Sequence, residues 1–180
     1  KGEGFYFLYI FKMKDLNSKA TNGYDMDRLN YLASVLKEVG KFDNTSFPGR
    51  LILQKTVFIL KSMGLGELNY DFTLYLNGPY SSTLANDGYI LEEKGLDNFG
   101  NTIIEKDVKI ISNFKNMVNG MENNVIWFEA IGTALFLKTR SSSLSKVEIF
   151  EILKARHRYL GHKDLMDDVW NRLRMFKLVT

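Results

Sequence analysis

The amino-acid sequence predicts a mainly α-helical protein, with a multi-helix, winged-helix-like architecture that includes one short strand or wing element. Apolar residues recur at helical spacing along most of the chain. Only 2 of the 180 residues are proline, which would interrupt helix interiors. The alternation of apolar and polar residues that is typical of a half-buried strand is confined to residues 70–76.

Composition limits the possible chemistry. The chain has no cysteine, so disulfides and thiolate sites are excluded. With only two histidines, a histidine-built metal site would need carboxylates to complete it, and we expect neither a metal nor a cofactor. The longest apolar run, residues 5–11, is too short to span a bilayer. We therefore expect a cytoplasmic protein with no membrane partner.

Residues 1–24 differ from the rest of the chain. An aromatic block at 5–11 precedes a polar linker, and position 1 is not an initiator methionine. The block is either a strand, buried or paired with a partner's edge, or a product of start-site choice or cloning. Residues 25–180 are expected to form a single helical domain, with sub-lobes 25–104 and 105–180 as the alternative division.

Three helices are predicted in the first half of that domain. The first begins at Asp25 and ends at Gly40, the second covers about 49–63, and the third begins at Ser81 or Ser82 and ends at about 94. The helix at 49–63 is apolar around most of its circumference, so it should be central. The strand at 70–76 should end at the Asn77-Gly78-Pro79 turn.

Further along the chain, we predict a short hairpin or wing at 99–104, followed by helices over about 105–118 and 124–138. Ser145 and Glu148 have the spacing of a capping box that opens a further helix. The last helix should cover about 163–176.

Gln54 and Lys55 form a polar pair inside the apolar helix at 49–63. One interpretation makes this the recognition helix of a helix-turn-helix, with Arg50, Gln54, Lys55 and Lys61 facing DNA. The other has Gln54 hydrogen-bonding the backbone of the Asn77-Gly78-Pro79 turn. We favour the structural interpretation, because a recognition helix exposes one whole face to DNA, whereas the helix at 49–63 is apolar around most of its circumference.

Basic residues concentrate toward the C-terminus: residues 138–180 carry ten basic and five acidic side chains. They could bind an anion or nucleic acid, or they could simply form a solvated surface near helix C-termini. The candidates for anion or nucleic-acid binding are Arg140, Lys146, Lys154, Arg156, Arg158, His162 and Lys163.

No catalytic constellation stands out, since no nucleophile with a base and no carboxylate pair can be identified. Asp167 and Asp168 follow His162, but sequential carboxylates on a helix point in different directions, so we reject a metal site there. We expect a protein that is not an enzyme.

Two segments carry a family resemblance. Residues 53–60 (LQKTVFIL) and 75–84 (YLNGPYSSTL) resemble the pattern of the YwgA-like uncharacterised proteins of bacteria and archaea, as do residues 127–137 and 169–173. A looser resemblance extends to the Panacea domain of SocA-type antitoxins. That looser resemblance is limited to the signatures Leu53-Gln54-Lys55 and Gly78-Pro79. The residues of the structural motif as a whole are Leu53, Gln54, Lys55, Phe58, Gly78, Pro79, Tyr80 and Ser81.

The resemblance implies a helical, winged-helix-like binding module with no established activity. We therefore expect a non-enzymatic regulatory protein that binds a macromolecule, in which the basic segment contacts an anionic partner. A protein–protein adaptor or antitoxin-like module and a nucleic-acid-binding regulator are the alternatives, and a homo-oligomer remains open.

Overall fold

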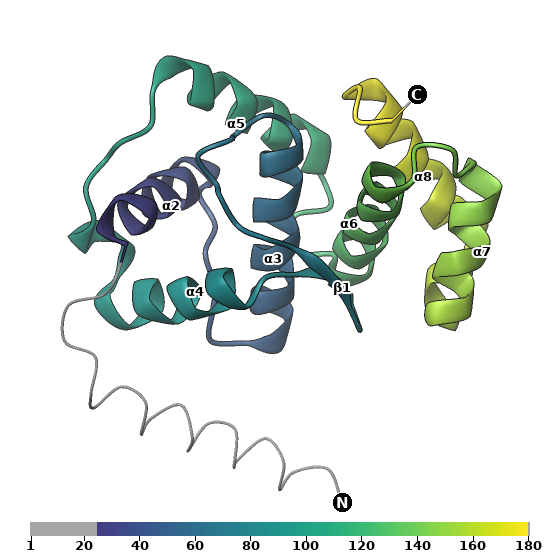
Figure 1. Cartoon of the computed structure of the whole chain (residues 1–180), viewed down its shortest axis with the longest axis horizontal. Coiled ribbons are helices and arrows are strands. Elements are labelled where there is room, and N and C mark those ends of the chain that lie inside the picture. Colours follow the sequence, from purple (N-terminus) through teal and green to yellow (C-terminus); the bar gives the residue numbers. More distant parts are fainter. Residues whose placement is uncertain (1–24, 180) are drawn as a thin grey trace, which may run out of the picture.

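The computed structural model describes residues 25–179, so the N-terminal block and linker of residues 1–24 lie outside the described residues. The described helices are α2 (Met26–Val39), α3 (Phe47–Ser62), α4 (Ser82–Lys94), α5 (Glu105–Val118), α6 (Val125–Arg140), α7 (Lys146–Arg156) and α8 (Lys163–Met175). Short 3₁₀ helices η1 (Leu96–Asn98) and η2 (Arg158–Gly161) and strands β1 (Thr73–Tyr75) and β2 (Gly78–Tyr80) complete the fold (Figure 1). The prediction of a mainly helical protein with a short strand or wing element is confirmed.

Local side-chain capping determines where most of the helices begin. The side chains of Asp25, Ser46, Ser81 and Asn124 each accept a hydrogen bond from the first turn of the helix that follows. The predicted capping box of Ser145 and Glu148 opens α7. Because Ser46 is the cap and Pro48 fits the first turn, α3 begins two residues before the predicted start.

The strand predictions need two corrections. β1 is shorter than the predicted 70–76, and Leu76 is 66% exposed although the alternating pattern placed it on the buried face. The predicted hairpin at 99–104 is wrong, because this segment runs along α2 instead. Asn30, Ser34 and Lys37 of α2 hydrogen-bond its backbone at Phe99, Gly100 and Thr102, so these groups need no strand partner.

The sheet is a hairpin in which Thr73 pairs with Tyr80 and Tyr75 with Gly78. Between them, Leu74 pairs with Pro79, which has no N–H to donate. That pair must therefore be the non-hydrogen-bonded kind, so the Pro79 carbonyl points away from β1. We call residues 73–80 the hairpin.

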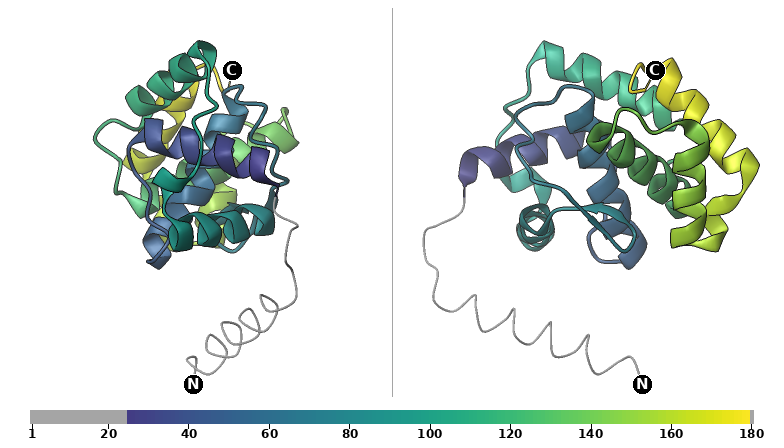
Figure 2. Two further views of the ribbon diagram at one scale, coloured as in Figure 1. Left: turned by 90° about the vertical axis from the view of Figure 1, so that its left-hand side faces the viewer. Right: turned by 45° about the vertical axis from the view of Figure 1, so that its right-hand side comes forward.

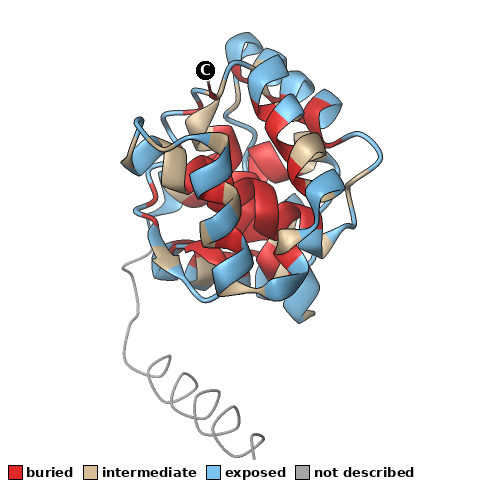
Figure 3. Ribbon diagram, turned by 90° about the vertical axis from the view of Figure 1, so that its right-hand side faces the viewer, coloured by how far each residue is buried: buried red, intermediate tan, exposed pale blue. Residues whose placement is uncertain are grey.

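Helices α3 and α6 pack side by side at the centre of the molecule, as expected for α3 (Figure 1). α6 also contacts β2, α7 and α8, and its residues from Trp127 to Phe136 are all buried. Figure 3 shows these inner turns in red, surrounded by helices whose outward faces are exposed. The hairpin lies against both central helices.

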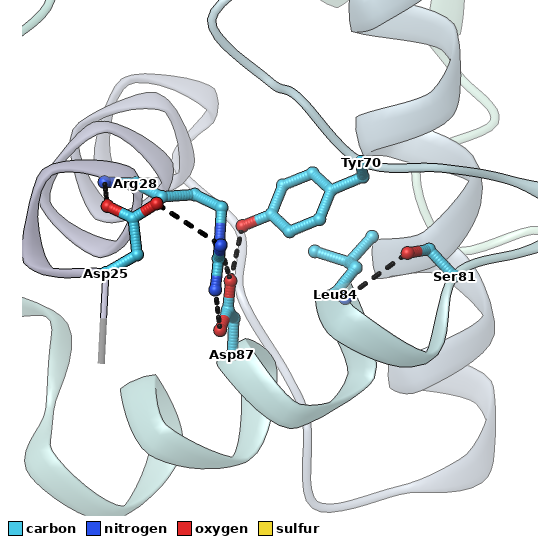
Figure 4. Close-up of polar contacts among 6 residues, drawn as sticks. All are labelled: Asp25, Arg28, Tyr70, Ser81, Leu84 and Asp87. Atoms are coloured by element: carbon cyan, nitrogen blue, oxygen red, sulfur yellow. Dashed lines mark hydrogen bonds and ion pairs between the residues drawn. The ribbon is translucent and has the colours of Figure 1, made fainter. Parts of the chain in front are cut away.

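A partly buried polar network joins α2 to α4 (Figure 4). Asp87, which is 3% exposed, accepts hydrogen bonds from Arg28 Nε at 2.7 Å and from the hydroxyl of buried Tyr70 at 2.8 Å. This charge-assisted bond raises the pKa of Arg28, while burial raises the pKa of Tyr70. The network therefore fixes α4 relative to α2 and to the segment that enters the hairpin.

Candidate functional site: the clamped hairpin and the cationic corner

Gln54 holds the chain just after the hairpin. Its amide nitrogen donates to the Ser81 carbonyl at 2.9 Å, and its amide oxygen accepts from the Ser81 N–H at 2.8 Å. Both residues are buried. The interpretation of Gln54 as a structural brace fits these bonds, but the predicted partner is wrong: Gln54 holds the backbone of Ser81, two residues after Pro79, and not the Asn77-Gly78-Pro79 turn.

Lys55 is buried as well, at 3% exposure, and its Nζ donates to the Pro79 carbonyl at 2.9 Å. This is the carbonyl that the hairpin register directs away from β1. Burial lowers the pKa of Lys55 to about 8, although the nearby charge of Glu129 partly opposes the shift.

The other polar residues of α3 also serve the fold. Arg50 donates to the Asn44 carbonyl at 3.2 Å and to the Thr45 carbonyl at 2.8 Å. Lys61 donates to the Tyr70 carbonyl at 2.7 Å. All four side chains that a DNA-reading helix would use are therefore bonded to backbone within the protein. Two apolar motif residues, Leu53 and Phe58, are buried beside them.

Gly78 permits close contact between the hairpin and α6. Its φ is +91°, in the left-handed region, and an added Cβ would collide with the Thr133 hydroxyl and lie 3.3 Å from Lys55 Cε. On α6, a Cβ at Gly132 would lie 3.0 Å from the Lys55 stem. Both glycines therefore make room for the buried lysine.

Glu129 of α6 completes the cluster and is 2% exposed. Its Oε2 accepts hydrogen bonds from the Tyr159 hydroxyl at 3.0 Å and from the Asn77 amide at 3.3 Å. His157 Nε2 lies 3.5 Å from its Oε1, which has no hydrogen-bond partner in the described structure. Glu129 therefore links the hairpin turn to η2.

The C-terminal end of α7 is hydrogen-bonded to the tip of the hairpin. Arg156 donates to the carbonyls of Tyr75 and Leu76, and the His157 ring lies 3.1 Å from the Leu76 carbonyl. Tyr159 stacks on His157 with ring centroids 5.1 Å apart. The basic segment 154–163, which we call the cationic corner, thus lies beside the hairpin tip.

The structure divides the seven predicted anion-binding residues into two groups. Four have partners within the protein: Arg140 donates to the Phe72 carbonyl at 3.3 Å, Arg156 holds the hairpin, Lys146 pairs with Asp167, and Lys154 lies 3.8 Å from Glu151. Of these four, Lys146 and Arg156 are partly buried, and Arg140 and Lys154 are exposed. The other three candidates, Arg158, His162 and Lys163, are exposed near the start of α8.

The hairpin also presents apolar surface to solvent. Tyr75 is 61% exposed and Leu76 66% exposed, and Tyr80 lies 5.7 Å from Tyr75 between ring centroids. Exposed apolar side chains scattered singly are ordinary, whereas these three lie together on one hairpin. The hairpin tip therefore offers an apolar contact next to the cationic corner.

Sequence reasoning missed the roles of Asn77, Glu129 and Thr133. Glu129 is the only acidic residue in the apolar run 125–137, so it has the same signature as the Gln54–Lys55 pair in α3. A lone carboxylate in a buried helix needs partners, and that rule could have linked it to Lys55. The contacts of Asn77 and Thr133 depend on how the hairpin sits against α6, which has no local signal.

Within residues 25–179, no helix combines the length and apolar character needed to cross a membrane. Over the same range, no group of three or more His, Cys, Asp or Glu side chains is placed to hold a metal ion. Comparison with protein-family models, with curated proteins and with solved structures found no match to this chain. The resemblance to the YwgA-like family therefore stays a prediction that rests on the motifs.

Replacing Gly78 by alanine should destabilise the protein more than the same change at Gly40, which has a φ of +81° but open space around it. Gly40→Ala should cost about 1–2 kcal/mol for the left-handed backbone. Gly78→Ala adds a collision with Thr133, so a further loss of about 1–3 kcal/mol is expected in urea unfolding.

Adding Thr133→Ala to Gly78→Ala should recover part of that loss, because it removes the colliding hydroxyl, which has no hydrogen-bond partner of its own in the described structure. Equal losses at Gly78 and Gly40, or no recovery in the double variant, would contradict the packing described here.

The lowered pKa of Lys55 predicts a pH-dependent stability. Between about pH 8 and the usual lysine pKa of about 10.4, the unfolded chain binds a proton at Lys55 that the folded protein does not, so this group's contribution to stability rises with pH. From pH 7 to 9.5 the gain is about 2 kcal/mol.

The measurement is the free energy of unfolding of the native protein and of Lys55→Met at several pH values over that range. The free energy of unfolding of the native protein should increase relative to that of Lys55→Met as pH rises. A difference that stays constant would show that Lys55 keeps an ordinary pKa in the folded protein.

Proposed function

We propose that the protein is a non-enzymatic binding module that recognises an acidic segment of another protein through the hairpin tip and the cationic corner. One observation carries the proposal: exposed Tyr75 and Leu76 sit on a turn that Arg156 holds against a segment with four basic and no acidic residues. The apolar pair would anchor the partner, and the basic side chains would attract its carboxylates.

The apolar hairpin tip, together with the internal contacts of several basic side chains, favours a protein partner over nucleic acid. Nucleic-acid affinity depends on neutralising several phosphates at once. Here the side chains of Arg140, Lys146, Lys154 and Arg156 already contact carbonyls or carboxylates of the protein itself. Arg140 and Lys154 stay exposed in spite of these contacts, so the choice of an acidic peptide rests mainly on the apolar Tyr75 and Leu76 beside the cations.

The burial of the polar cluster supports a role without catalysis. Lys55, Glu129 and Thr133 are each at most 3% exposed, so a substrate would not reach them without displacing the hairpin. The two described surface pockets are lined by other residues. The cluster therefore positions the hairpin, and recognition occurs on its outer side.

The test is a fluorescence-anisotropy titration with two probes of equal charge, a synthetic Glu-rich peptide with a central Leu and a single-stranded oligonucleotide. We expect the peptide to bind more tightly, and both Arg158→Glu and Leu76→Asp to weaken its binding about tenfold or more. Lys106→Glu, an exposed charge reversal on α5, is the matched control.

Preferential binding of the oligonucleotide would replace this proposal by the nucleic-acid alternative. Peptide binding that Arg158→Glu and Leu76→Asp leave unchanged, or no binding of either probe, would contradict it.

A further inference from the structure

The contact between the hairpin tip and the end of α7 contains a histidine that the proposed binding function does not use. His157 is the C-cap of α7, and its ring nitrogen Nε2 lies 3.1 Å from the Leu76 carbonyl and 3.5 Å from Glu129 Oε1. Figures 1 and 2 show α6, α7 and α8 together at the end of the molecule opposite α2. His157 therefore connects three parts of the chain: the hairpin, α6 and the end of α7.

One of the two acceptors beside His157 is buried without a hydrogen bond. Glu129 is 2% exposed, and its Oε1 makes no hydrogen bond within the described structure, whereas its Oε2 accepts two. Leaving a buried carboxylate oxygen without a donor costs free energy. In the described part of the chain, His157 is the one basic side chain within 4 Å of a Glu129 oxygen.

The geometry makes the charge of the His157 ring matter. Because both neighbours of Nε2 are acceptors, Nε2 carries the hydrogen of the neutral ring, and that single hydrogen is shared between them. A further proton, taken up from solvent at Nδ1, makes the ring cationic. The positive charge strengthens both the hydrogen bond to the Leu76 carbonyl and the attraction to the Glu129 carboxylate. Histidine is the side chain that changes its charge between about pH 5 and 8.

The other charged and titratable groups around the ring act in different directions. Arg156, at the end of α7, donates to the same carbonyl, so its charge opposes protonation of the ring. Tyr159 of η2 stacks on the ring and donates its hydroxyl to Glu129. Lys55 of α3 acts on Glu129 by its charge. From α8, no charged side chain within the described residues makes a hydrogen bond or an ion pair with the ring. Glu129 is therefore the acidic group that favours the cationic ring.

We propose that protonation of His157 fixes the hairpin tip to α6, so that the tip becomes more ordered as pH falls from about 8 to about 5.5. The cationic ring supplies the charged partner that Glu129 Oε1 lacks, and through the same nitrogen it holds the Leu76 carbonyl. This pH-dependent contact concerns the position of the tip and does not depend on what the tip binds.

The test is NMR-detected amide hydrogen exchange of the ¹⁵N-labelled full chain at several pH values between about 5.5 and 7.5. The reporter is the Gly78 amide, because Gly78 pairs with Tyr75 at the closed end of the hairpin. After correction for the intrinsic pH dependence of exchange, its protection factor should rise about fivefold as pH falls over this range, since a charge-assisted bond is stronger than a neutral one. Amides in the middle of α3 should show no such rise.

Three variants make the assignment specific. His157→Gln can still donate to the Leu76 carbonyl but cannot take up a proton, so it should abolish the pH response. His162→Gln, at the other histidine of the chain, which is exposed, is the matched control and should leave the response unchanged. Glu129→Gln keeps an acceptor oxygen for Tyr159 and removes the charge, so it should reduce the response to about twofold or less.

Thermal unfolding of each variant checks that it folds, and the partly exposed His157 keeps the test valid if the buried Glu129→Gln does not. A native protein without the pH response would overturn the proposal. So would a response that persists in His157→Gln, that disappears in His162→Gln, that stays full in a folded Glu129→Gln, or that the amides of α3 share.

Discussion

The two hydrogen bonds between the Gln54 side chain and the Ser81 backbone are the constraint on which the rest of the structure depends. They fix the end of the hairpin to α3 at a buried position where an unpaired amide would be costly. Ser81 is also the N-cap of α4, so the same contact sets where that helix begins. From α4, Asp87 reaches Arg28 and Tyr70, which carries the constraint to α2. Gln54 thus fixes the end of the hairpin and the start of α4 to α3, and Asp87 then joins α4 to α2.

Charged side chains from three helices hydrogen-bond to the hairpin, in addition to the packing of the hairpin against α3 and α6. Lys55 approaches it from α3, Glu129 from α6, and Arg156 from the end of α7. Burying a lysine and a glutamate costs free energy that hydrophobic side chains of the same size would not. Among the described residues, Glu129 Oε1, which lies 3.5 Å from His157 Nε2, and the Thr133 hydroxyl make no hydrogen bond, and this adds to that cost. What the arrangement provides is position: the turn that carries Tyr75 and Leu76 is fixed from three sides while those side chains stay in solvent.

Most helices could be predicted from the sequence, because their signals are local. Gly40, Ser81 and the Ser145–Glu148 box act within one turn of the helix ends that they define. The brace role of Gln54 was also predictable, since a polar residue in an apolar helix needs partners. The further hairpin or wing expected at 99–104 is wrong because strand pairing depends on what lies alongside, and there α2 supplies the hydrogen bonds. The need of Glu129 for polar partners could be predicted from its place in an apolar run. Which partners it has, and the role of Thr133, follow from the crossing of α3, α6 and the hairpin, which no short window contains.

Hydrogen exchange at the Ser81 amide tests the central claim most directly, by comparing the native protein with Gln54→Leu, which keeps much of the side-chain volume but removes both hydrogen bonds. The account predicts that in the native protein this amide exchanges as slowly as amides in the middle of α3. In the variant it should lose protection selectively, together with the first turn of α4, while α8 keeps its protection. Unchanged protection at Ser81 in Gln54→Leu would show that packing alone holds the hairpin, and would contradict the account.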